Sequence, residues 1–164
     1  MEYAKDSEFI KDFISRTKRN IDQGRHPFEV TQLINSLVGL LILPKERYYD
    51  SIRNNMVNAQ LLRTMQEYVT KGKTGKTCSL QQIVRHMRNS VSHFHIECKA
   101  DASTMEIDKI VFTDYPNGDE NYPPNFQIEL PVTIVNQFVN QFSDAVVQSI
   151  MLNEKTGHIL PPND

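Results

Sequence analysis

The chain has 164 residues, of which 39% are hydrophobic and 23% charged, so it has enough apolar material for one compact domain and is not a disordered chain. Eighteen Lys and Arg against twenty Asp and Glu give a net charge of -2, which excludes a polycation that binds nucleic acid indiscriminately. Two cysteines without a CxxC motif indicate neither a disulfide framework nor a zinc knuckle. Any phosphate-binding surface is therefore local.

The first residues carry charges throughout, unlike the apolar run of a signal peptide. The longest apolar run, residues 37–43, is far shorter than the roughly 20 residues that span a bilayer. We therefore expect a cytoplasmic protein without a membrane segment. Both thiols are expected to be reduced, with Cys98 buried in a strand.

Helical periodicity dominates the first half of the chain. Apolar residues at three- and four-residue steps predict a first helix over residues 3–22 and a second, the central core helix, over residues 27–44. Asp50 or Ser51 can cap a third helix that runs to about Thr70. The basic segment GKTGKT at residues 72–77 resembles a P-loop, but its spacing is two residues short and it follows a helical pattern. We interpret it as a flexible basic loop.

The second half mixes helical and alternating patterns. A fourth helix is predicted over residues 79–94, and a last helix opens at Pro131. Between them, short alternating runs and a loop at residues 115–125 suggest a small antiparallel sheet. The predicted fold is mainly α: a bundle of four or five helices with a small antiparallel β insertion at about residues 95–130, before the last helix. A single domain over residues 1–152 and a flexible tail over 153–164 are expected.

The predicted fourth helix has one apolar face and one face suited to phosphate. The polar face holds Arg85, His86, Arg88, Asn89, Ser92 and His93. Residues 71–99 contain six Lys and Arg against one Glu, a local charge of +5, and no Asp or Glu lies between Ser79 and Ile96. A cationic face without carboxylates suits a phosphodiester and lacks the acidic ligands of a two-metal site. This pattern disfavours a metal-dependent nuclease.

The alternative interpretation is that the polar face of this helix is only exposed to solvent and that one of its histidines covers the end of the helix. Lys or Glu would serve a solvated face as well, whereas Arg, His and Asn are residue types that bind phosphate and move protons near neutral pH. Periodicity alone leaves both interpretations open.

The string RNSVSH, from Arg88 to His93, resembles the arginine, polar residue, then histidine motif of the HEPN superfamily of ribonucleases and related helical proteins. The apolar lead-in QQIVRHM and the flanking helices are also similar to HEPN domains, so the resemblance covers about residues 28–152. It implies a metal-independent endoribonuclease, without a cofactor, active as a homodimer whose cleft pairs two motif helices. By position, Arg88, Asn89 and His93 are the implied active-site residues. The β insertion departs from the minimal family bundle.

The chemistry of RNA cleavage agrees with the active site that the resemblance implies. RNA supplies its own nucleophile in the 2′-hydroxyl, His93 can transfer its proton, and the guanidinium of Arg88 can stabilise the charged phosphorane. Asn89 could orient the imidazole or the phosphate. Further contacts to RNA phosphate are expected from Arg85, His86, Ser92, Lys73 and Lys76.

Other functional classes are to be weighed against a ribonuclease. A non-catalytic HEPN-type module that binds a partner protein, RNA or nucleotide fits the same helices, since some family members have lost catalysis. A phosphatase or nucleotidyltransferase would need a carboxylate pair that the basic segment lacks. A zinc site at His93, His95 and Cys98 has no evident fourth ligand. The expected setting is a toxin or phage-defence system, with an antitoxin or regulatory protein as a possible partner.

Overall fold

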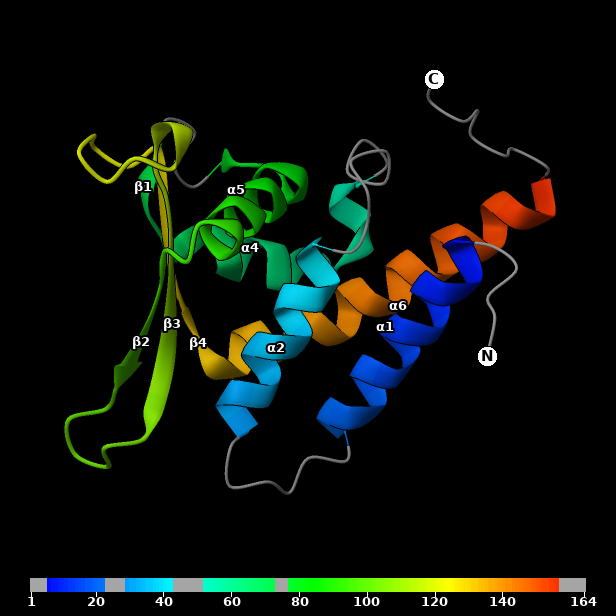
Figure 1. The fold of residues 1–164 in the computed structure, drawn as a ribbon, viewed down its shortest axis with the longest axis horizontal. Helices are drawn as coiled ribbons and strands as arrows, with labels where there is room; N and C mark the ends of the chain where they lie inside the picture. Colours follow the sequence, from blue (N-terminus) through cyan, green and yellow to red (C-terminus); the bar gives the residue numbers. More distant parts are fainter. Residues whose placement is uncertain (1–5, 23–28, 43–51, 73–76, 157–164) are drawn as a thin grey trace.

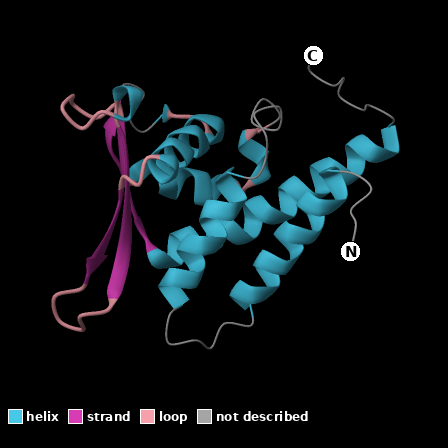
Figure 2. Cartoon of the chain, viewed as in Figure 1, coloured by secondary structure: helices cyan, strands magenta, loops and turns pink. Residues whose placement is uncertain are grey.

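The computed structural model describes residues 6–22, 29–42, 52–72 and 77–156. Figures 1 and 2 show its helices packed on one side of an antiparallel sheet. The helices are α1 (Asp6–Asp22), α2 (Glu29–Ile42), α4 (Ala59–Glu67), α5 (Leu80–Ser92) and α6 (Val132–Thr156), with short 3-10 turns η1 (Asn54–Met56) and η3 (Pro116–Gly118). The strands are β1 (Val69–Gly72), β2 (Ile96–Ala100), β3 (Ile107–Asp114) and β4 (Phe126–Pro131).

The sheet has the strand order β1-β4-β3-β2 and every pairing is antiparallel. Residues two apart on a strand share a face, and the inner face carries Ile110 and Phe112 of β3 beside Ile128 and Leu130 of β4. These side chains are buried because α5 and α6 pack against that face. The outer face carries mainly polar side chains, such as Lys109 and Thr113 of β3 beside Glu129 and Gln127 of β4. Figure 1 shows no described helix over this face.

The core is continuous between the sheet and the helices. Helix α6 contacts α1, α2, α4, β3 and β4, and its rings Phe138 and Phe142 stack at 5.1 Å between centroids. Helix α2 meets both α1 and α5, and its Leu37, Leu40 and Leu41 are buried. This burial confirms α2 as a central core helix.

Close helix contacts hold α1 in place. A Cβ on Gly39 of α2 would lie 2.6 Å from the ring of Phe13 of α1, so the ring packs directly on the glycine and a larger residue would require it to move. On the other side of α1, Nζ of Lys18 lies 2.6 Å from Oδ2 of Asp144 on α6. The first helix is therefore part of the bundle and not an appendage.

The mainly α prediction is confirmed, but the sheet is larger than a small insertion. It lies in the middle of the chain and has four strands, because residues 69–72 add β1 next to β4. The third predicted helix is wrong in its bounds: α4 begins after Asn58, whose side chain accepts from the amide of Leu61, and ends before Tyr68. The β-branched Val69 then pairs with Ile128 of β4 instead of extending the helix, and Thr70 lies where the register shifts before Lys71 pairs with Gln127. The expected cap at residues 50–51 lies outside the described residues.

Three smaller expectations also change. Pro131 is the last residue of β4 and does not open the helix, and α6 continues through Thr156 into the predicted tail. Cys98 does lie on a strand, but the thiol is exposed on the edge strand β2, whereas Cys78 is buried. Neither cysteine forms a disulfide.

Candidate functional site

Helix α5 positions most of the predicted site, and its start is well fixed. Ser79 forms a capping box: its Oγ accepts from the amide of Gln82 at 3.2 Å, and Oε1 of Gln82 accepts from the amide of Ser79 at 2.8 Å. The amide of Leu80 donates to Oδ1 of Asn54 at 2.9 Å. Because the first turn is anchored to the capping box and to η1, the register of the polar face is set.

The helix ends in a Schellman motif around Phe94. His93 is the C-cap residue, the amide of Phe94 donates to the carbonyl of Val91 at 3.2 Å, and the amide of His95 donates to the carbonyl of Ser90 at 2.8 Å. Phe94 takes a left-handed conformation with φ of 61°. This turn places His93 at the tip of α5 and directs the chain into β2.

One stripe of α5 faces a buried carboxylate. His86 and Asn89 are one turn apart, and both contact Asp114, the last residue of β3. Nδ1 of His86 lies 2.6 Å from Oδ2 of Asp114, and Nδ2 of Asn89 donates to the same oxygen at 3.1 Å. The His86 ring also stacks on Phe126 at 4.5 Å between centroids. This network joins the helix to the inner face of the sheet.

His93 continues the same stripe, one turn beyond Asn89, and lies against the loop after β3. A Cβ on Gly118 would be 2.6 Å from Nδ1 of His93, so the ring packs closely on the glycine. The ring of His93 also stacks on His95 at 5.9 Å, while its residue remains exposed. The imidazole thus packs against Gly118 and His95, and the residue is exposed to solvent.

His95 stacks on His93, and its side chain is 10% exposed. Its Nε2 lies 3.1 Å from Oε1 of Glu120, and its ring meets Tyr115 edge-on at 4.9 Å. Nδ1 of His95 is buried and has no hydrogen-bond partner among the described residues. His95 therefore supports the ring of His93 from the loop side.

The remaining predicted residues lie apart from this stripe. Arg85, Arg88 and Ser92 form the neighbouring stripe of α5, in which Arg85 and Ser92 are exposed and Arg88 is half-buried. Lys73 and Lys76 lie outside the described residues. Of the predicted residues, the structure therefore brings His86 and Asn89 together at Asp114, and places His93 one turn further on.

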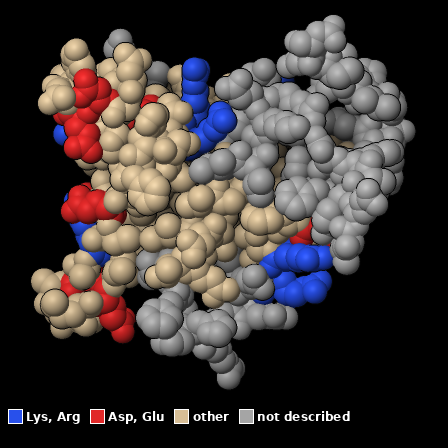
Figure 3. Space-filling view, viewed as in Figure 1, with Lys and Arg blue, Asp and Glu red and all other residues tan. Residues whose placement is uncertain are grey.

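The expectation of a face without carboxylates is wrong. The sequence around α5 has no Asp or Glu, but the fold brings Asp114 and Glu120 from the β3 region to its histidines. On the side of the molecule drawn in Figure 3, most acidic side chains lie over the sheet and its loops. The field near His93 is thus less positive than the local charge predicts.

Sequence reasoning missed Asp114, Gly118 and Glu120. Asp114 follows Ile110 and Phe112 at two-residue steps, and this alternation indicates the buried face of a strand. No comparable signal marks Glu120, because a loop residue has no period. Among the described residues, no three His, Cys, Asp or Glu side chains gather as a metal site, and no described helix is long and apolar enough to cross a membrane.

A helical bundle with an arginine and histidine motif at the end of an amphipathic helix defines the class, and the chain belongs to the HEPN superfamily. The family model described as HEPN pEK499 p136 matches residues 1–150, which covers nearly the whole described chain. No curated protein and no solved structure matches the chain.

Proposed function

We propose that this protein is a metal-independent endoribonuclease that acts as a homodimer, with Arg88 and His93 as catalytic residues. The observation that carries the proposal is the placement of His93. Its imidazole lies at the exposed tip of α5, packed on Gly118 and stacked on His95, five residues after Arg88 in a chain of the HEPN superfamily. An imidazole that is packed on one side and open to solvent on the other, on a helix that also carries Arg88, suits proton transfer at a phosphodiester.

The reaction needs only groups that RNA and these side chains supply. One imidazole takes the proton of the 2′-hydroxyl, whose oxygen attacks the adjacent phosphorus. The bond from phosphorus to the 5′-oxygen breaks, and that oxygen leaves with a proton donated by a protonated imidazole, so that a 2′,3′-cyclic phosphate remains. Arg88 donates hydrogen bonds to the non-bridging oxygens, where negative charge accumulates.

The other polar residues of α5 receive supporting roles. Arg85 and Ser92 are exposed on the stripe of Arg88 and are proposed to bind flanking phosphates, together with Lys73 and Lys76. Asn89 and His86 act through Asp114, which holds α5 against β3. Both are therefore proposed as positioning residues and not as groups that touch the phosphate.

Two copies of the chain complete the site in this proposal. A single α5 carries Arg88 and His93 on neighbouring stripes, and a two-fold axis would bring the second copy's motif across the cleft. We propose a cytoplasmic setting in a toxin or phage-defence system, with an antitoxin or regulatory protein as partner.

Cleavage of RNA by the purified protein tests the proposal. Wild type is expected to cleave in excess EDTA, to leave 2′,3′-cyclic phosphate ends and to spare DNA, which has no 2′-hydroxyl. His93→Ala and Arg88→Ala should each lower the rate at least about 100-fold without a change in melting temperature. Arg63→Ala, which removes an exposed arginine on α4, is the matched control. Cleavage that persists in His93→Ala would overturn the assignment.

A non-catalytic interaction module is the second candidate. Asp114 and Glu120 bring negative charge to the histidines, which disfavours a phosphate at that place. A wild-type protein that cleaves no RNA, but keeps its fold and binds a partner, would favour this function.

A further inference from the structure

Phe94 has a left-handed backbone conformation, which is unfavourable for phenylalanine, and its apolar side chain is exposed to solvent. It occupies the position after the C-cap of α5, where helices that end in a Schellman motif usually have glycine. A φ of 61° is sterically unfavourable for a residue with a large side chain. The residue is also 92% exposed, so no burial offsets this cost. Local physics therefore favours glycine at this position, and a backbone outlier of this kind points to a function.

The position of the ring indicates what that function is. Phe94 directly follows His93, and consecutive Cα atoms are about 3.8 Å apart, so the two side chains leave the backbone together at the C-terminal end of α5. Its neighbours Ser92 and His93 are both polar and exposed. An aromatic ring among polar groups is the usual arrangement for stacking an unpaired base.

We propose that Phe94 is a base-binding residue, whose ring stacks on an unpaired base next to the phosphate at His93. The inference rests on the proposed function for the position of that phosphate. Because a phenyl ring has no hydrogen-bonding group, the contact selects for unpaired bases and not for a particular base. The substrate is therefore single-stranded RNA or an unpaired loop, since the faces of bases within a duplex are already stacked.

A matched pair of glycine variants separates this role from backbone strain. Met105, in the loop between β2 and β3, is also exposed and has φ of 60°, but it lies beyond the opposite end of β2 from Phe94. Phe94→Gly and Met105→Gly should each raise the melting temperature by about 2–4 °C, because each relieves a left-handed side chain. Only Phe94→Gly should weaken RNA binding, by about 5- to 150-fold in Kd. Phe94→Trp should retain the affinity.

The binding probe is a 2′-O-methyl single-stranded RNA of mixed sequence, which cannot be cleaved by internal attack. Its Kd therefore reports binding independently of the proposed reaction. A series of probes, each lacking one base, locates the contact. Loss of the stacked base should raise the Kd of wild type and leave the Kd of Phe94→Gly unchanged.

Three results would overturn the inference. These are equal affinities of wild type and Phe94→Gly, no binding of unpaired RNA by wild type, or a dimer that dissociates in Phe94→Gly, which would assign the ring to the interface between copies. A wild type that binds the probe but never cleaves RNA would contradict only the proposed function. Retained cleavage with equal affinities would contradict only the role of Phe94.

Discussion

At the scale of single residues, Asp114 links the candidate site to the core. One oxygen of this buried carboxylate contacts both Nδ1 of His86 and Nδ2 of Asn89. Buried polar groups that lose a partner cost more than the hydrogen bond itself contributes, because they cannot return to water. The network therefore matters for stability as well as for the position of α5.

Asp114→Ala is expected to lower the free energy of unfolding by about 1–3 kcal/mol, since it leaves two polar side chains without their acceptor. Urea denaturation measures the change. Asp108→Ala removes a half-buried carboxylate from the same strand and should change the free energy by less than about 0.5 kcal/mol. Equal stability of both variants would show that the network contributes nothing.

Gly118 is the second residue with a specific role. Its φ of +71° is strained for any other residue, and an added Cβ would collide with the ring of His93. Gly118→Ala should destabilise the protein by about 1 kcal/mol and displace the imidazole, with loss of most RNA cleavage. Cleavage rate and melting temperature are both measured. Full activity in this variant would show that the loop after β3 does not position His93.

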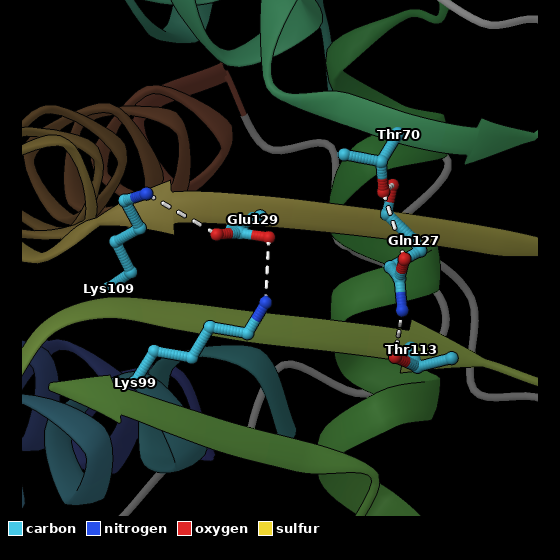
Figure 4. Close-up of polar contacts among 6 residues, drawn as sticks. All are labelled: Thr70, Lys99, Lys109, Thr113, Gln127 and Glu129. Atoms are coloured by element: carbon cyan, nitrogen blue, oxygen red, sulfur yellow. Dashed lines mark hydrogen bonds and ion pairs between the residues drawn. The ribbon is translucent and has the colours of Figure 1, made fainter.

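At the scale of elements, ion pairs and hydrogen bonds join the strands across the outer face of the sheet (Figure 4). Glu129 of β4 lies 3.0 Å from Nζ of Lys99 on β2 and 3.4 Å from Nζ of Lys109 on β3. Beside them, the side chain of Gln127 links Thr70 of β1 to Thr113 of β3. These contacts span all four strands and help to set their register.

The sheet should lose part of its stability in acid through Glu129. The hydrogen bond from Lys99 holds the pKa of Glu129 below its ordinary value, and the charges of Lys99 and Lys109 act in the same direction. A carboxyl with a lowered pKa stabilises the fold above its unfolded pKa, and this contribution is lost as pH falls through the folded pKa. Glu129→Gln should therefore melt a few degrees lower at neutral pH, and the difference should vanish in acid. Glu67→Gln on α4 is the control, and a difference that grows in acid would contradict the assignment.

At the scale of the whole molecule, the proposed dimer makes a specific prediction. If each site takes Arg88 from one copy and His93 from the other, a mixed dimer of Arg88→Ala and His93→Ala has one intact site. A refolded equimolar mixture, in which about half of the dimers are mixed, should then recover about a quarter of the wild-type rate. Each variant alone is the control. No recovery, with mixed dimers detected by native mass spectrometry, would place both residues of each site in one copy.

The helices and the motif were predictable because their signals are local. Apolar steps of three and four residues mark α1, α2, α5 and α6, and the capping box of Ser79 and Gln82 marks the start of α5. The motif from Arg88 to His93 lies on one helix, so its spacing alone places it at the end of α5. Membership of the HEPN superfamily followed from the same stretch and agrees with the family match.

Tertiary structure alone decided the rest, because pairing partners lie far apart in the sequence. Strand β1 forms because β4 pairs with it. The sequence does not reveal this strand, because Tyr68 continues the apolar spacing of the helix before it. The carboxylates that reach His86 and His95 come from residues 114 and 120, beyond the stretch whose charge is positive. Likewise, the chain shows a phenylalanine after His93, but only the fold gives it a left-handed backbone and an exposed ring. Composition and period thus determine which segments form helices, whereas long-range packing determines which side chains meet at the site.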